Sequence, residues 1–209
     1  MAGAPFISAP LILDKPVSIF VYPSGMLVED HIESGNSWAK LIWTDSQSGD
    51  WVHTTTRFFF AWTNPSDYIV VINVSSDLDV RGQCTASAFP GLIFGGQTAI
   101  FVTTQLKVHL AGIALGGHDQ EQSITSFVAD TWGSIFGGDD ETLSEDILST
   151  KSLSYKQILV DVHQLVIIEV SMIAAYKIWG NGTVSLIFAR DHPFVACPAV
   201  MIDVLAPPP

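Results

Sequence analysis

Two residues with metal-binding side chains, Asp161 and His163, stand two positions apart in a segment whose apolar residues alternate as in a β-strand. On one strand their side chains would point the same way, with about 6–7 Å between the Cα atoms. Two ligands at that spacing could bind one metal ion. His109, which lies on another predicted strand, is a further candidate ligand.

The order Asp161-Val162-His163, followed by Glu169, resembles part of the first metal-binding motif of the cupins. The resemblance implies a metalloenzyme with its ligands on the inner face of a barrel. On a straight strand, however, Glu169 would lie about 20 Å from His163, and no second cupin motif follows. We therefore predict that the protein has no bound metal, no cofactor and no catalytic residues. A cupin-like metalloenzyme that uses Asp161, His163 and His109 is kept as an alternative.

The stretch Gly116-Gly117-His118-Asp119 contains two further polar side chains that could contact a metal or an anion. One histidine and its neighbour make at most half of a metal site. Gly-Gly also occurs at 95–96 and 137–138, so that the pairs are 21 residues apart, but the intervening segments share no further pattern. Because glycine allows the positive φ that chain reversals need, all three pairs are predicted to be turns.

Trp51 follows the polar stretch DSQSGD and is expected to be exposed. An exposed indole offers an apolar face with a polar edge, and sugars stack on such faces. Trp51 is therefore the candidate ligand-binding residue of a lectin-like protein that binds carbohydrate.

The composition limits the classes of partner. The chain is 48% hydrophobic and 14% charged, against a usual charged share of about 25%, so much of its surface is expected to be either neutral and polar or buried against other chains. The net charge is −12, with no basic run, which argues against direct binding of nucleic acid. Cys84 and Cys197 are too few for a disulfide framework and are predicted to be buried, reduced thiols.

Most of the chain reads as β-strand. Apolar and β-branched residues alternate over 52–62, 98–112 and 155–179. Further strands are expected near 17–22, 38–43, 68–75, 78–89 and 194–205, which makes about nine in all. Hairpins are predicted at 59–75 and around Trp179-Gly180-Asn181-Gly182. Residues 121–149 are the exception: Ile124, Phe127, Val128, Thr131 and Trp132 recur at helical spacing, so a short helical or irregular insertion is predicted there.

These patterns predict an all-β protein, an antiparallel sandwich resembling a jelly roll. An extended arm is expected over 1–16, the sandwich over 17–205 and a proline-rich tail over 206–209. No signal peptide or membrane-spanning segment is visible, so synthesis in the cytoplasm is expected. The leading hypothesis is a non-enzymatic subunit of a symmetric homo-oligomer such as a virus capsid, found in the virion. A lectin, the cupin-like enzyme and a pore former that inserts 92–116 as a hairpin remain alternatives.

Overall fold

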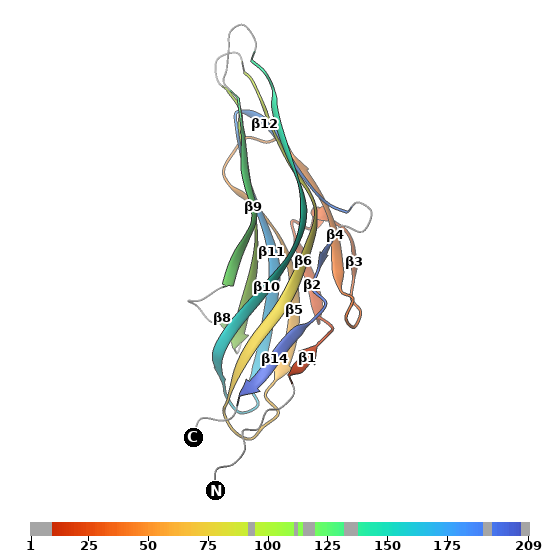
Figure 1. Cartoon of the computed structure of the whole chain (residues 1–209), viewed down its shortest axis with the longest axis vertical. Coiled ribbons are helices and arrows are strands. Elements are labelled where there is room, and N and C mark those ends of the chain that lie inside the picture. The colour runs from red at the N-terminus through yellow and green to blue at the C-terminus, as the bar shows by residue number, and fades with distance from the viewer. Residues whose placement is uncertain are drawn as a thin grey trace.

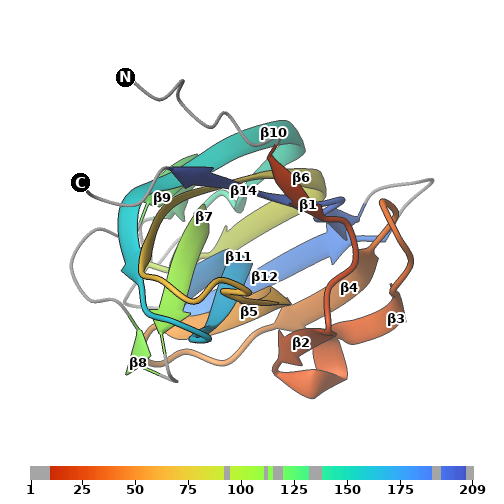
Figure 2. The ribbon, with the colours of Figure 1, turned by 90° about the horizontal axis from the view of Figure 1, so that it is seen from below.

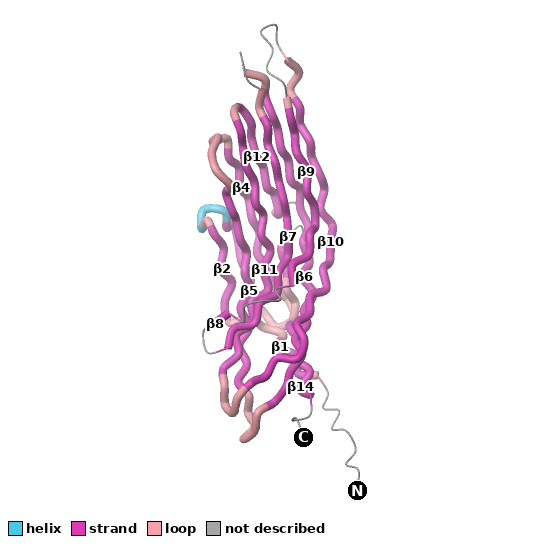
Figure 3. The backbone as a smooth tube through the Cα atoms, turned by 90° about the vertical axis from the view of Figure 1, so that its left-hand side faces the viewer, coloured by secondary structure: helices cyan, strands magenta, loops and turns pink. Residues whose placement is uncertain are grey.

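The computed structural model describes residues 10–91, 95–110, 113–114, 120–131, 138–189 and 194–205. Apart from one 3-10 turn, their regular structure is β-strand, as Figure 3 shows. None of the described residues forms a helix long and apolar enough to cross a membrane. The elements are β1 (Leu11–Leu13), β2 (Ser18–Tyr22), η1 (Ser24–Met26), β3 (Leu27–His31), β4 (Trp38–Asp45), β5 (Val52–Thr63), β6 (Val70–Phe89), β7 (Gln97–Leu110), β8 (Ile113–Ala114), β9 (Gln120–Asp130), β10 (Glu141–Val160), β11 (Leu165–Trp179), β12 (Asn181–Phe188), β13 (Val195–Ala196) and β14 (Val200–Leu205).

The strands form two antiparallel sheets, which confirms the predicted all-β sandwich. Sheet A contains β1, β3, β4, β6, β10, β12, β13 and β14, and sheet B contains β2, β5, β7, β8, β9 and β11. The two sheets are the layers of a long, narrow body (Figure 1), and the view from below shows them enclosing a common interior (Figure 2). Buried apolar side chains from both sheets fill that interior, and Phe58, Phe60, Tyr176 and Phe188 are the largest.

Four strand pairs are nested about the connection between β7 and β9. Going outward from this connection, β7 pairs with β9, β6 with β10, β5 with β11, and β4 with β12. Pairs β7·β9 and β5·β11 lie in sheet B, and pairs β6·β10 and β4·β12 lie in sheet A. The first half of the domain therefore pairs with the second half in reverse order, while the chain passes repeatedly from one sheet to the other.

The predicted hairpins are wrong because the chain changes sheets where they were expected. β5 belongs to sheet B and β6 to sheet A, so the turn at 64–69 connects the two layers. β11 and β12 are likewise in different sheets. Gly180, with φ of +70°, makes that crossing, and Asn181 and Gly182 already belong to β12.

The predicted insertion at 121–149 is also corrected, since its described residues are strands. Residues 120–130 form β9 at one edge of sheet B, and β10 begins at Glu141 at the edge of sheet A. Acidic residues of β10 close the seam between these edges. Glu141 accepts a hydrogen bond from the backbone N–H of Asp130, and Glu145 accepts one from Thr125.

The strands predicted at 52–62, 98–112 and 155–179 are confirmed in part, with 111–112 outside the described residues. Ile100, Val102, Leu106 and Val108 of β7 are buried as expected, but the third segment is split by a turn at 161–164 into β10 and β11, and Val162 is exposed. The strands expected at 68–75 and 78–89 are one long strand, β6. Within the predicted arm, residues 11–13 form β1 and pair with β14; residues 206–209 lie outside the described part.

Of the described glycines in the Gly-Gly pairs, Gly96 is required by close packing and not by the positive φ that the turn prediction assumed. Gly95 and Gly96 connect β6 to β7, and a Cβ on Gly96 would lie 2.0 Å from the carbonyl oxygen of Asn181. The pair Gly116-Gly117 lies outside the described residues, as do His118, Asp119 and Gly137. Gly138 lies just before β10.

Candidate functional site

Three aromatic side chains gather on the outer face of sheet B, and we call Trp51, Phe101 and Trp179 the aromatic corner. The ring centroids of Trp51 and Phe101 are 5.2 Å apart, and those of Trp51 and Trp179 are 6.0 Å apart. The two indoles are almost perpendicular, at 84°. Trp51 is 41% exposed, Phe101 37% and Trp179 36%, so each ring contributes accessible surface.

The register of sheet B brings these side chains together from β7, from β11 and from the residue just before β5. Phe101 of β7 pairs with Ala175 of β11, and Ala175 pairs with His53 of β5, two residues after Trp51. Residues in register across a sheet point to the same face. The short side chain of Ala175 leaves room between Trp51 and Phe101.

Hydrogen bonds tie the loop before Trp51 to the end of β11. The backbone N–H of Gly49 and the Ser48 hydroxyl both donate to the carbonyl oxygen of Ile178, each at 3.1 Å. The backbone N–H of Gly180 in turn donates to the Ser48 hydroxyl at 3.1 Å. Since Trp179 lies between Ile178 and Gly180, the same bonds hold the backbone on both sides of Trp179 against the loop that precedes Trp51.

Polar side chains border the aromatic corner. The Lys177 ammonium lies 4.7 Å from the ring centroid of Trp179, close enough for a cation–π contact. Gln97 pairs with Trp179 across the sheet, and Asp130 pairs with Gln97. The corner thus combines exposed ring faces with an ammonium, an amide and a carboxylate on one face.

A second polar cluster lies further along the same face. Glu169 is 5% exposed, and its carboxylate lies 3.5 Å from Arg57 Nε and 3.2 Å from His109 Nε2. Lys107 is the register partner of Glu169 on β7. Opposite charges on neighbouring strands stabilise a sheet, and this cluster joins β5, β11 and β7.

A third arrangement connects the two sheets inside the sandwich. Trp43 Nε1 donates to the Tyr176 hydroxyl at 2.7 Å, and that hydroxyl donates to Asp45 Oδ2 at 2.6 Å. Burial raises the pKa of Tyr176, and the hydrogen bond to Asp45 adds to the rise. Burial alone would raise the pKa of Asp45, but hydrogen bonds from Tyr176 and from the backbone N–H groups of Gln47 and Ser46 hold it below its ordinary value. Asp45 also lines a shallow polar pocket formed by residues 44–47 and 183–185.

The metal-ligand candidates are not positioned as a set. Asp161 and His163 lie in the turn between β10 and β11 and not on a strand, so the expected strand geometry is wrong; His163 has φ of +55°. His163 Nε2 lies 3.4 Å from Asp67, whereas His109 contacts Glu169 on the outer face of sheet B. The described residues contain no group of three or more His, Cys, Asp or Glu side chains that could hold a metal ion.

The sequence interpretation found Trp51 but missed its two aromatic neighbours. Phe101 belongs to a correctly predicted strand and lies between Ile100 and Val102, whose side chains point inward. Because side chains alternate along a strand, this position alone would have placed Phe101 on the outer face. Trp179 was assigned to a hairpin turn, which concealed its position at the end of β11.

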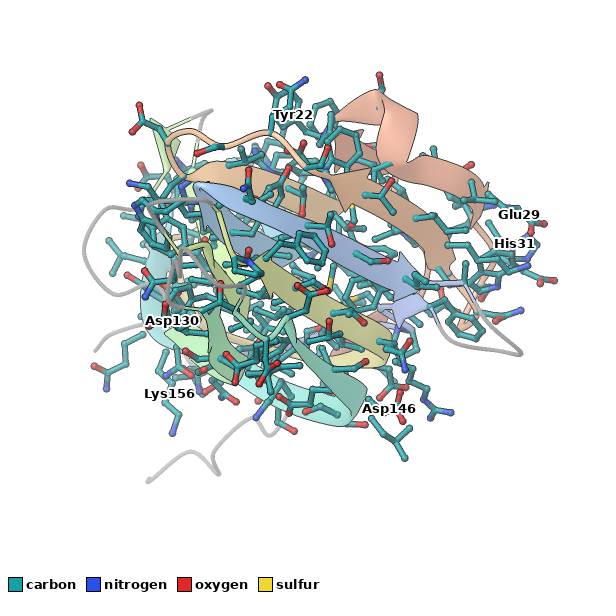
Figure 4. The ribbon with its side chains drawn as sticks, turned by 90° about the horizontal axis from the view of Figure 1, so that it is seen from above. Tyr22, Glu29, His31, Asp130, Asp146 and Lys156 are labelled. Carbon is teal, nitrogen blue, oxygen red and sulfur yellow. The ribbon has the colours of Figure 1, made fainter. Side chains whose placement is uncertain are left out.

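Outward-pointing side chains of other kinds cover the remaining faces. Tyr22 and Asp146 point away from opposite sides of the sandwich (Figure 4), Tyr22 from sheet B and Asp146 from sheet A. On sheet A, hydrogen bonds connect β6 to β10 along the outer face, among them Gln83 to Asp146 at 2.9 Å and the pair of Thr85 and Ser144 at 2.9 Å. This hydroxyl-rich ladder differs from the aromatic corner on the opposite sheet.

Comparison with known proteins identifies no family. No family model and no curated protein matches the chain. Among solved structures, it is similar to a chain in a structure of infectious bursal disease virus, Gx strain, with 9% sequence identity and a TM-score of 0.15. The match covers 93% of this chain and 43% of that one, so the chain spans less than half the length of this neighbour. At such a TM-score the likeness supports neither a shared fold nor a shared function.

Proposed function

We propose that the protein is a non-enzymatic structural subunit that associates with copies of itself into a symmetric assembly, such as a virus shell. In this proposal the sandwich is a jelly roll and the place of action is the virion. The nested strand pairing is the observation that carries the proposal.

The strand order supports the jelly roll. Sheet A contains the run β4-β12-β6-β10, and sheet B contains the run β5-β11-β7-β9. Eight strands divided in this way between two facing sheets, with the chain crossing between them, are what a jelly roll requires. Jelly rolls occur in viral capsid proteins, lectins and cupins, so a jelly-roll order of the strands supports the proposed capsid role as well as the lectin and cupin alternatives.

Exposed apolar side chains favour self-association among these classes. At one end of the sandwich Asn64 connects two turns, since its Nδ2 donates to the carbonyl oxygens of Tyr68 and Asp161. Around these turns lies a group of exposed apolar residues that we call the end patch, consisting of Tyr68, Ile69, Leu159, Val162 and Leu165. Contiguous exposed apolar surface is typical of protein–protein contacts.

The low proportion of charged residues adds to this support. At 14% charged residues, the chain has few side chains with which to keep an isolated surface solvated. Leu148, on the outer face of β10, is 80% exposed. Contacts with other copies would remove such side chains from water.

The enzymatic and pore-forming alternatives have less support. Asp161 and His163 lie in an end turn, whereas a cupin-like site would need ligands on the inner faces of the sheets. Residues 97–110, which a pore former would have to release, are paired with β11 on one side and with β9 on the other. Releasing them would break the centre of sheet B.

The experiment that tests the proposal is a mass measurement on the purified chain at micromolar concentration, by light scattering after size exclusion, with negative-stain microscopy of the same fractions. We expect a mass well above that of one chain and particles of uniform size. The variant Val162→Asp should lower the mass because it places a charge in the end patch, while Thr44→Asp, on an exposed part of β4, serves as a charge-matched control. A monodisperse monomer for the unmodified chain would contradict the proposal.

A further inference from the structure

We infer that the aromatic corner binds the pyranose ring of a neutral glycan. The inference goes beyond the structural role proposed above, because it assigns a ligand class to the outer face of a subunit. It depends on the geometry of Trp51, Phe101 and Trp179 and on the polar residues beside them.

The shape of the corner matches the two kinds of surface that a pyranose presents. One face of such a ring consists of C–H groups, and its edge carries hydroxyl groups. The perpendicular indoles of Trp51 and Trp179 allow the C–H face to stack on one ring while the edge of the sugar contacts the other. Aromatic faces carry partial negative charge and attract the slightly positive hydrogens of C–H groups.

The polar border supplies partners for the hydroxyl groups. Gln97 offers both a donor and an acceptor, Asp130 offers acceptors and Lys177 offers donors. Gln97 and Asp130 lie in the same cross-strand row as Trp179, and the Lys177 ammonium lies over the face of the Trp179 ring. A sugar that stacks on Trp51 and meets Trp179 with its edge would therefore lie next to the row that contains these groups.

Other occupants fit the corner less well. The net charge of −12 opposes the approach of nucleic acids and acidic glycans. A second copy of the chain would need about 800 Å² of surface on each partner for a stable contact. The aromatic corner consists of only three rings, and the polar side chains of Lys177, Gln97 and Asp130 border it, which makes it a poor surface for such a contact. The end patch contains five exposed apolar side chains and is the better candidate for subunit contacts.

The corner is also held in place before any ligand arrives. The bonds from Gly49, Ser48 and Gly180 fix the loop before Trp51 against the end of β11. Binding loses less affinity when the contacting side chains are already ordered. The site therefore needs no rearrangement to expose its rings.

The test uses saturation-transfer NMR with the full-length protein and four probes, the methyl pyranosides of galactose, glucose, mannose and N-acetylglucosamine. We expect saturable binding of at least one probe with Kd on the order of millimolar, and the strongest transfer to the protons of its C–H face. Trp51→Ala and Trp179→Ala should each weaken binding by about tenfold or more, equivalent to at least ~1.4 kcal/mol. Phe20→Ala is the matched control, because Phe20 is an exposed aromatic residue on the outer face of the same sheet.

Several results would overturn the inference. One is the absence of saturable binding by all four probes, and another is equal weakening by Phe20→Ala and the corner variants. A third is a lower particle mass in Trp51→Ala without any change in sugar binding, which would make the corner a contact between copies. The mass measurement on the unmodified chain is independent of these results, so the structural proposal and the glycan site can fail separately.

Discussion

Replacing Thr56 by valine should stabilise the protein, although the residue is completely buried. Three consecutive threonines of β5, Thr54, Thr55 and Thr56, are buried. Thr54 and Thr56 both point inward, and the hydroxyl of Thr54 donates to the carbonyl oxygen of Ala174 at 3.1 Å. The Oγ1 atoms of Thr55 and Thr56 have no hydrogen-bond partner among the described residues.

The magnitude follows from this difference. A buried hydroxyl without a partner costs about 1–3 kcal/mol, and valine has nearly the shape of threonine with a methyl group in place of the hydroxyl. Thr56→Val should therefore raise the free energy of unfolding by about 1 kcal/mol or more. Thr54→Val should lower it by about 1 kcal/mol, because it removes a formed hydrogen bond. The two variants change the same chemical group two residues apart on one strand and should have effects of opposite sign.

Denaturant unfolding followed by circular dichroism measures both effects, with all proteins at one concentration because association would also shift the midpoint. For a chain of this size, 1 kcal/mol corresponds to about 2–4 °C in Tm. If Thr56→Val destabilises the protein as much as Thr54→Val does, the reasoning is refuted. The Thr56 hydroxyl would then have a partner such as a buried water molecule.

Three further predictions concern other positions. Gly82→Ala should destabilise the fold by about 1–3 kcal/mol or more, since the added Cβ would lie 2.4 Å from a side-chain atom of β12 and 2.5 Å from a backbone oxygen of that strand. Gly35→Ala should cost about 1 kcal/mol, because the space around Gly35 is open but its φ is +68°. Thermal melts of the two variants measure both effects. Burial raises the pKa of both Cys84 and Cys197 to about 12, so neither thiol should react with a thiol reagent at pH 8 until the protein unfolds; rapid labelling of the native protein would contradict their burial. The pKa of Asp45 in the folded protein lies below its ordinary value of 3.8, so the stability that Asp45 contributes is present above pH 3.8 and is lost as the pH falls through its folded-state pKa. Asp45→Asn should therefore make the free energy of unfolding decline less steeply below about pH 4 in acid titrations. An unchanged decline would mean that other carboxylates cause it.

The strands could be predicted from the sequence because alternation records which side chains are buried. In β7 the inner residues Ile100, Val102 and Leu106 share one parity, and this pattern identifies both the strand and its faces. Alternation does not record which strand lies alongside. The turn at 64–69 and the crossing at Gly180 therefore looked like hairpins, although each connects two layers.

The error at 121–149 has a different cause. β9 lies at the seam between the sheets, where Thr125 and Ala129 are buried while Val128 is exposed. A bulge opposite Val102 and Thr103 shifts by one residue which side chains of β9 point inward. The apolar residues of the segment therefore recur at spacings that resemble those of a helix. The seam itself, where Glu141 and Glu145 of β10 accept hydrogen bonds from β9, could not be seen in the sequence.

The candidate site was only partly predictable for the same reason. Trp51 stands out because it follows a polar loop, but its relation to Phe101 and Trp179 depends on the order of β5, β11 and β7 in sheet B. The candidate ligands Asp161 and His163 seemed paired because a strand was assumed to continue through them. The turn between β10 and β11 removes that pairing.

The nested pairing of the strands also determines how the chain must fold in time. The partners in β7 and β9 are closest in sequence, those in β6 and β10 are farther apart, and those in β4 and β12 are the farthest. Because closing a larger loop costs more entropy, the pairing of β7 with β9 has the lowest entropic cost. Each completed pair then brings the next pair closer, so folding should proceed outward from the middle of the chain. A topology dominated by such distant contacts folds in milliseconds to seconds, and during that interval the unpaired edges of β4 and β12 are open to contact with neighbouring chains.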